Sequence, residues 1–251
     1  MDFRKTFDKI PEAFDKFRPR YCEELFQELT RVCGLDETKR VLEIGPGTGQ
    51  ATEPILKTGC DYTAIELGEN FTAMMKEKFG GYPNFHIVNA DFETYEFEKE
   101  AYDLIYSAAT IQWIPEQIEF TKTFDMVKPG GYLAMFMTRC DRWIANPGLA
   151  EAIDKVYDEY FVVKQKYTCK MDYKNALKYG FTNLIYKEWK KERVLNAEEF
   201  CSYIRTHCDH INLEEHYKSK FYEGIRKAIL DAGNKITLID TIPLYLVQKP
   251  L

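Results

Sequence analysis

Apolar and amphipathic stretches alternate between residue 40 and about residue 137 of this 251-residue chain. Short apolar runs bounded by turn residues are typical of buried parallel strands, and the amphipathic stretches between them are typical of helices. The pattern predicts strands at 40–44, 62–66, 85–89, 102–107 and 132–137. It also predicts helices at about 49–57, 69–79 and 115–127, with a Pro-Gly-Gly turn at 128–131. This alternation indicates an α/β fold with a Rossmann-like, doubly wound, mostly parallel sheet.

The pattern changes after the fifth strand. It predicts helices with aromatic faces over 147–180, a strand at 181–189, helices over 196–233 and an antiparallel last strand at 235–248, which completes a seven-stranded sheet. The mixed charges from Lys187 to Arg193 indicate the solvated part of an edge strand. We expect a single domain over 1–251, made of an N-terminal helical cap at 1–35, a ligand-binding core at 36–140, and helical lid insertions with the last two strands at 141–251.

The composition is that of an ordinary globular protein, with 45% hydrophobic and 29% charged residues. No apolar run approaches the roughly 20 residues needed to cross a bilayer, and the N-terminus lacks an apolar signal-peptide core. The net charge of −6 and the scattered basic residues argue against a nucleic-acid partner. The seven cysteines include no Cys-x-x-Cys pair, so we expect no metal site, no disulfide framework and a cytoplasmic location.

The segment from Val41 to Gln50, VLEIGPGTGQ, carries the clearest chemical signal in the chain. A buried strand there runs into a turn whose three glycines can take backbone conformations that a Cβ would block. Backbone N–H groups and a helix N-terminus then face whatever lies above the strand. The segment therefore predicts a ligand site built largely from the backbone.

Two classes of ligand compete for this loop. The dinucleotide fingerprint Gly-x-Gly-x-x-Gly fits at Gly45 and Gly47 but requires a glycine where Gln50 stands. Glu43 lies two residues before the first glycine. Its negative charge favours a ligand with a positively charged group and disfavours a ligand with a pyrophosphate. Glu66, at the end of the second strand, can accept hydrogen bonds from a ribose diol and suits either ligand. An NAD-dependent oxidoreductase therefore stays an alternative, and so does a turn without a ligand.

The acid-x-Gly-x-Gly-x-Gly motif resembles the nucleoside-binding loop of class I S-adenosylmethionine (SAM) methyltransferases. The resemblance implies SAM as the cofactor and S-adenosylhomocysteine as the product. It places the ribose on Glu66 and the adenine on Asp91 and Phe92, where a carboxylate accepts from the exocyclic amine and the ring packs on the base. The cofactor-binding residues implied in this way are Glu43, Gly45, Gly47, Gly49, Glu66, Leu67, Asp91, Phe92, Ser107 and Arg18.

Other segments resemble the trans-aconitate methyltransferase-like, type 11 group of small-molecule methyltransferases. Residues 112–115, QWIP, are similar to its Leu-Gln-Trp segment, and residues 14–21 to its Tyr-x-x-x-Arg-Pro-x-Tyr entry segment, with Phe14 in place of the first tyrosine. The resemblance implies that Arg18 pairs with the SAM carboxylate or with an acidic substrate. The candidate substrate-binding residues are Gln112, Trp113, Arg139, Trp143, Arg205 and Tyr21. A core tryptophan and surface arginines are the alternative interpretations.

These features predict a SAM-dependent methyltransferase that acts on a small molecule, with a carboxylate as the favoured acceptor. A carboxylate is already anionic at pH 7, whereas a hydroxyl or amine acceptor would need a general base, for which His207 and Tyr21 are the candidates. An N- or O-methyltransferase of an aromatic or amine metabolite is the alternative within enzymes. A SAM- or nucleoside-binding module without turnover is the alternative from another class. We expect no nucleic-acid or membrane partner, and a monomer or a homodimer.

Overall fold

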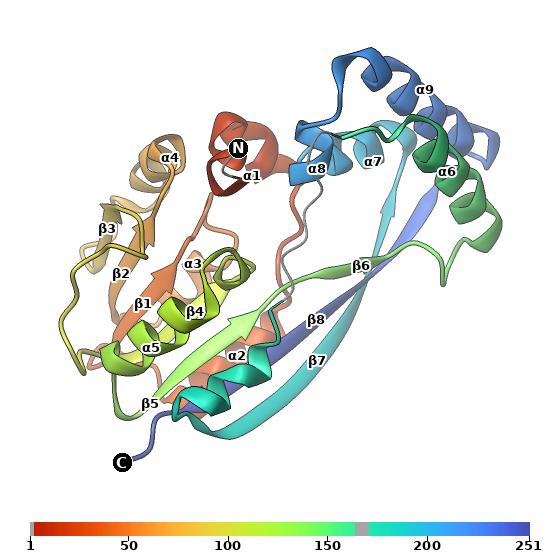
Figure 1. Ribbon diagram of the computed structural model, residues 1–251. Helices are drawn as coiled ribbons and strands as arrows, with labels where there is room; N and C mark the ends of the chain where they lie inside the picture. The colour runs from red at the N-terminus through yellow and green to blue at the C-terminus, as the bar shows by residue number, and fades with distance from the viewer. Residues whose placement is uncertain (1–2, 164–170) are drawn as a thin grey trace. The chain divides into compact units, whose positions relative to one another are not determined.

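A computed structural model describes residues 3–163 and 171–251 of the chain (Figure 1). Its hydrogen-bonded sheet has the strand order β3-β2-β1-β4-β5-β8-β6, with β7 paired to β8. The described residues group into two compact units, which we call the core unit (19–138, 171–189 and 242–251) and the helical unit (3–18, 139–163 and 190–241). No helix among the described residues is long and apolar enough to span a membrane.

The core unit contains the parallel part of the sheet. Its strands are β1 (Arg40–Ile44), β2 (Asp61–Glu66), β3 (Phe85–Asn89), β4 (Tyr102–Ala108) and β5 (Val127–Phe136). Its helices are α2 (Glu23–Cys33), α3 (Thr52–Leu56), α4 (Glu69–Phe79) and α5 (Glu116–Met126), with 3-10 turns η3 (Ile111–Trp113) and η4 (Tyr173–Tyr179). Residues Leu244–Gln248 of β8 pair antiparallel with β5.

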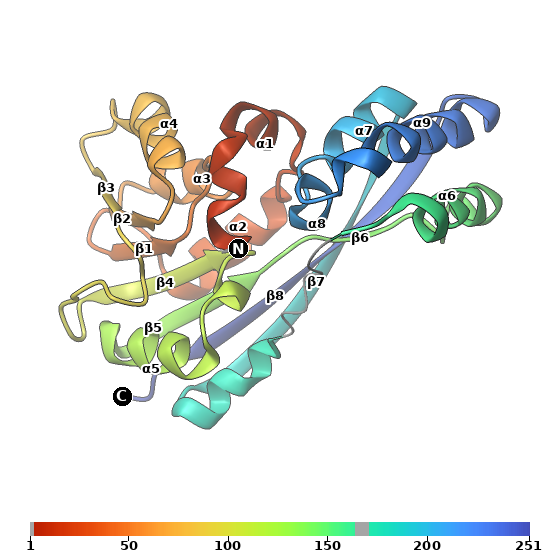
Figure 2. The same ribbon diagram turned by 45° about the horizontal axis from the view of Figure 1, so that its top comes forward.

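Side-chain alternation along the strands divides the core unit into two hydrophobic layers. Val41 of β1 packs with residues of α2, α3 and α4, whereas Leu42 packs with residues of α5 and η4. Figure 2 shows the first group of helices on one side of the strands and α5 on the other. The parallel strands are thus buried on both faces, as a doubly wound sheet requires.

The helical unit is built on the remaining helices. It contains η1 (Phe3–Lys5), η2 (Phe7–Lys9), α1 (Pro11–Phe17), α6 (Pro147–Tyr160), α7 (Ala197–Ile204), α8 (Cys208–Ile211) and α9 (Glu215–Asp231). The short strand β6 (Arg139–Asp141) pairs antiparallel with Ile239–Thr241 of β8. A capping box between Asn196 and Glu199 starts α7 by satisfying backbone N–H groups that the helix leaves unpaired. Strands β7 (Thr182–Leu195) and β8 (Ile236–Gln248) contribute residues to both units.

The structure confirms the predicted α/β class and changes three details. The sheet has eight strands instead of seven, because β6 is only three residues long and leaves no periodic pattern. The turn predicted at 128–131 lies within β5, where Gly130 donates to the carbonyl of Lys249 and Gly131 accepts from its N–H. Arg193, predicted to be solvated, is 15% exposed and pairs with the buried Asp240.

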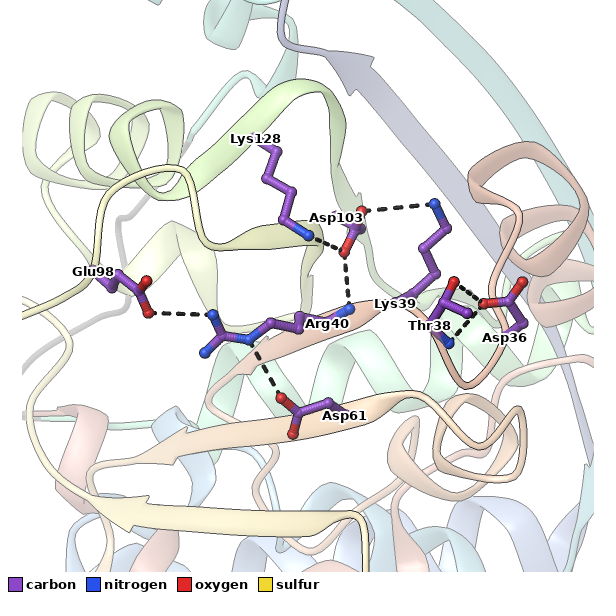
Figure 3. A network of polar contacts seen from close by, with 8 residues as sticks. All are labelled: Asp36, Thr38, Lys39, Arg40, Asp61, Glu98, Asp103 and Lys128. Carbon is purple, nitrogen blue, oxygen red and sulfur yellow. Dashed lines mark hydrogen bonds and ion pairs between the residues drawn. The ribbon is translucent and has the colours of Figure 1, made fainter.

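A polar network joins the amino ends of the parallel strands (Figure 3). Asp103 of β4 accepts hydrogen bonds from the backbone N–H of Arg40 (2.9 Å) and from Lys128 Nζ (2.7 Å). The Arg40 side chain reaches Asp61 on β2 and Glu98 in the preceding loop. Although burial opposes it, these hydrogen bonds lower the pKa of Asp103. These charges join the amino ends of the strands. Ligands of open α/β sheets bind at the opposite edge, outside the carboxyl ends of the strands.

Candidate cofactor site

Gly45 opens the loop after β1 and lies against Thr110. Its φ is +62°, and a Cβ there would lie 2.2 Å from the Thr110 Cγ2 atom. Thr110 Oγ1 donates to the Gly45 carbonyl oxygen (2.8 Å), and the Gly45 N–H donates to Ile65 on β2 (2.9 Å). Glycine is required because of both the left-handed backbone and this close approach. Thr110 is a site residue that the sequence analysis missed.

Gly49 and Gly47 serve different purposes in the same loop. A Cβ on Gly49 would lie 2.5 Å from the ring of Phe79 on α4, so this glycine allows the loop to pack on a neighbouring helix. Gly47 has φ +59°, and its N–H donates to Glu66 Oε2 (3.0 Å). The loop is therefore fastened to the end of β2 through Gly47.

Glu66 is held at the carboxyl edge of the sheet by two backbone N–H groups. It is 6% exposed, and its second oxygen, Oε1, accepts from the Gly68 N–H (2.7 Å). Asn89 donates to the backbone oxygens of Glu66 (2.9 Å) and the half-buried Leu67 (3.3 Å). A carboxylate only accepts hydrogen bonds and each of its oxygens has two lone pairs, which suits the two hydroxyl groups of a diol. The arrangement orients an acceptor pair in advance of binding.

Glu43 lies behind the loop instead of above it. The side chain is fully buried, and its Oε2 accepts from Thr52 Oγ1 (2.5 Å) at the start of α3 and from the hydroxyl of Tyr62. Tyr62 in turn lies 2.5 Å from the hydroxyl of Tyr106. Burial raises the pKa of Glu43 to about 7, while the hydroxyl hydrogen bonds act in the opposite sense. We expected this acid to face a cationic ligand, but Oε2 is bonded to internal hydroxyl groups, and Oε1 is buried without a hydrogen-bond partner among the described residues.

Asp91 and Phe92 follow β3, at the same edge. Asp91 is half-buried, and its Oδ1 accepts from the Glu93 N–H (3.0 Å) while its backbone oxygen accepts from Thr94 and Tyr95. Phe92 is 5% exposed and packs in the hydrophobic layer beside α5. The predicted stacking of Phe92 on a base has little surface available, because the ring is a core side chain.

The segment after β4 is tightly braced. Ser107 is fully buried and accepts from the Ile111 N–H (2.9 Å), so it shapes the chain and offers no surface to a cofactor. Ala109 has φ +62°, a conformation that costs a non-glycine residue energy and that concentrates at functional sites. Gln112 donates to the Ala109 oxygen (2.9 Å) and accepts from the hydroxyl of Tyr173 (2.9 Å). Trp113, next in η3, is half-buried.

Of the remaining candidates only Tyr21 belongs to the core unit, where its ring meets Phe136 edge to face. The others lie in the helical unit: Arg18, Arg139, Trp143, Arg205 and His207. Arg18 donates to the Thr206 oxygen (2.7 Å) and lies over the ring of Phe14. Arg205 lies over the ring of Tyr222 and lines a hollow of about 520 Å³.

One of the two candidate general bases, His207, has a pKa far from its usual value. Burial, with Arg18 nearby, lowers the pKa of His207 well below its usual value, so its imidazole is neutral at pH 7.

Arg139 and Trp143 are exposed. No group of three metal-ligating side chains occurs among residues 3–163 and 171–251.

Part of the chain is similar to known methyltransferases. Residues 42–135 match the Methyltransferase domain family. The chain is 29% identical over 133 residues to a malonyl-[acyl-carrier protein] O-methyltransferase of Marinomonas sp., a match that covers 51% of this chain and 48% of that one. It is 40% identical over 63 residues to ribosomal RNA small subunit methyltransferase A of Hahella chejuensis, which covers 25% and 23%. The chain thus spans about half or less of the length of these relatives.

The fold agrees over a longer stretch. The structure of a protein from Anaeromyxobacter dehalogenans assigned as a type II methyltransferase superposes with a TM-score of 0.69 at 18% identity, covering 94% of this chain and all of the other. This likeness concerns the fold alone. By the family match, residues 42–135 form a methyltransferase domain, and SAM, the predicted cofactor, is the cofactor of this class. The match covers the glycine loop, Glu66 and Asp91, and it ends in β5.

Proposed function

We propose that the protein transfers the methyl group of SAM to a carboxylate oxygen of a small or carrier-linked acid. The observation that carries the proposal is Glu66, held by the Gly47 and Gly68 N–H groups at the carboxyl edge of the sheet, where an acidic side chain binds a ribose diol in folds of this kind. The O-methyltransferase of a malonyl thioester among the relatives supports an acidic acceptor. Ribosomal RNA methyltransferases also match, one of them at 27% identity over 146 residues, so the acceptor is tested against RNA in the assay below.

The chemistry demands little acid–base assistance. SAM supplies an electrophilic methyl group; an oxygen lone pair of the acceptor forms the new C–O bond as the C–S bond breaks, and the bonding pair stays on sulfur. A carboxylate is ionised at pH 7, so no proton has to move. The protein's residues contribute binding, alignment and exclusion of water, which can remove about 7–11 kcal/mol of the barrier.

The chain offers specific groups for this work. Gln112 and Trp113, braced by Ala109 and Tyr173, are proposed to contact the acceptor. Arg18, Arg139, Trp143, Arg205 and Tyr21 remain proposals for substrate recognition. His207, neutral at pH 7, is proposed as a base only for a hydroxyl or amine acceptor.

A transfer assay tests the proposal. The protein is incubated with tritiated-methyl SAM and, separately, with dicarboxylic and tricarboxylic acids, a malonyl thioester, a primary amine, a catechol and small-subunit ribosomal RNA. Methyl esters release volatile tritiated methanol in mild base, whereas N-methyl groups and methylated bases keep the label. We expect base-labile label with one or more acids. Base-stable label on the amine or the RNA, with none on the acids, would contradict the proposal.

A further inference from the structure

Lys122, on α5, gathers three backbone carbonyls of the loop that follows Asp91. Its Nζ donates to the oxygens of Phe92 (2.6 Å), Glu93 (3.2 Å) and Tyr95 (2.7 Å). A lysine ammonium has three N–H donors, so the three carbonyls use its full capacity. None of these three carbonyls lies in a helix or a strand. The hydrogen bonds to Lys122 therefore fix a segment that lacks regular secondary structure.

The ammonium group of Lys122 also lies over two aromatic rings. Its Nζ lies 5.0 Å from the ring centre of Phe92 and 5.3 Å from that of Phe97. The Phe92 ring thus contacts the ammonium group of Lys122 and also packs in the hydrophobic layer that includes residues of α5. Lys122 therefore contacts the loop after Asp91 through both the backbone and the aromatic side chains of that loop.

The charges around Lys122 are those of the loop and of its own helix. Glu119, one turn earlier on α5, is fully buried, and Asp91 and Glu93 also face the ammonium. Burial lowers the pKa of Lys122 and these carboxyl groups oppose the shift. Neither oxygen of Glu119 has a hydrogen-bond partner among the described residues. Burial raises the pKa of Glu119, and the positive charge of Lys122 opposes that shift.

We propose that Lys122 is a positioning residue that fixes the 91–95 loop and thereby sets the protein's selectivity for adenine in the cofactor. The inference rests on the proposed function, because it takes Asp91 as the acceptor for the exocyclic amine of the base. The Asp91 carboxylate is oriented by the Glu93 N–H, and the carbonyl of Glu93 is one of the three bonded to Lys122. Releasing that carbonyl leaves the turn held by its own hydrogen bonds from the Thr94 and Tyr95 N–H groups to the Asp91 oxygen, with less restraint on the direction of the Asp91 carboxylate.

The test compares two ligands on wild type and Lys122→Met. The ligands are S-adenosylhomocysteine and its deaminated analogue, in which a carbonyl oxygen replaces the exocyclic amine. The wild type should prefer the adenine ligand by at least roughly tenfold, because the analogue sets an oxygen against a carboxylate. Methionine keeps the apolar stem and removes the three donors, so the preference should fall to about twofold or less. Lys99→Met, at an exposed lysine that pairs with Asp125 instead of the 91–95 loop, is the matched control and should keep the preference.

The outcomes separate the inference from the proposed function. Equal preference in wild type and Lys122→Met, or an equal loss of affinity for both ligands, would overturn the positioning role. If the wild type binds neither ligand, the proposed function fails with it. If the methionine variant does not fold, Lys122→Arg keeps a cation over the two rings but places its donors differently, and it should show an intermediate preference; a wild-type preference there would also overturn the inference.

Discussion

Replacing Glu66 by glutamine removes the charge from the carboxyl group that two glycine N–H groups hold. The two hydrogen bonds, from Gly47 (3.0 Å) and Gly68 (2.7 Å), have a carboxylate as acceptor, and the side chain is 6% exposed. Hydrogen bonds to charged groups contribute about 1.5–3 kcal/mol each, and the amide's NH₂ would face one of the two donors. We expect a loss of about 1.5–3 kcal/mol in the free energy of unfolding.

The same change should weaken cofactor binding. A ribose diol would lose one of its two acceptor oxygens on Glu66, and the remaining bond would be to a neutral group. A loss of about 1.5–3 kcal/mol corresponds to a roughly 10- to 150-fold rise in the Kd for S-adenosylhomocysteine. Calorimetric titration measures the Kd, and urea unfolding measures the stability.

Glu69→Gln is the matched control, because Glu69 is an exposed glutamate three residues further along, in the first turn of α4. It should leave Kd unchanged and stability within about 0.5 kcal/mol of wild type. If Glu66→Gln binds S-adenosylhomocysteine as tightly as this control does, the ribose does not lie on Glu66 and the assignment of the site is wrong.

Three further predictions concern the scaffold of the site. Gly45→Ala should destabilise the protein by at least about 1–2 kcal/mol, because the backbone there is left-handed and the added methyl group would clash with Thr110. Gly148→Ala, whose methyl group would enter open space on α6, is the control and should not destabilise it. Thermal unfolding measures both. Asp103→Asn should lower stability at neutral pH, and because the folded-state pKa of Asp103 is depressed, the difference from wild type should shrink as the pH falls below about 3.8 in urea-unfolding series. The folded-state pKa of Glu43 is raised to about 7 from 4.5, so ionisation costs stability: wild type should lose roughly 3 kcal/mol relative to Glu43→Gln as the pH rises from 4.5 to 7, and a flat difference over that range would contradict the burial argument.

The parallel strands could be predicted from the sequence because each is a short apolar run between turn residues. Strands 40–44 and 85–89 and the helix 69–79 have the same bounds in the structure. The pattern failed where pairing depends on distant residues. Residues 128–131 carry a turn signal but pair with the C-terminal segment around Lys249, and β6 exists only because Ile239–Thr241 lies beside it.

The candidate site divides in the same way. The positions of the glycine loop, Glu66 and Asp91 follow from where strands end, so the sequence predicts them. The direction of a side chain does not: alternation along β1 turns Glu43 toward the layer that contains Tyr62 and Tyr106, and Phe92 packs into the opposite layer. Thr110, Asn89 and Lys122 were missed because each acts through a backbone atom far away in the sequence, a contact that no local motif records.

Calorimetric titration of the wild-type protein with SAM, S-adenosylhomocysteine and NAD tests the central claim most directly. We predict micromolar binding of SAM and S-adenosylhomocysteine and no heat with NAD, because Glu66 and the glycine loop form a nucleoside site without the third glycine of a dinucleotide fingerprint. Binding of NAD alone, or no binding of any of the three, would contradict the assignment of this edge of the sheet as a SAM site.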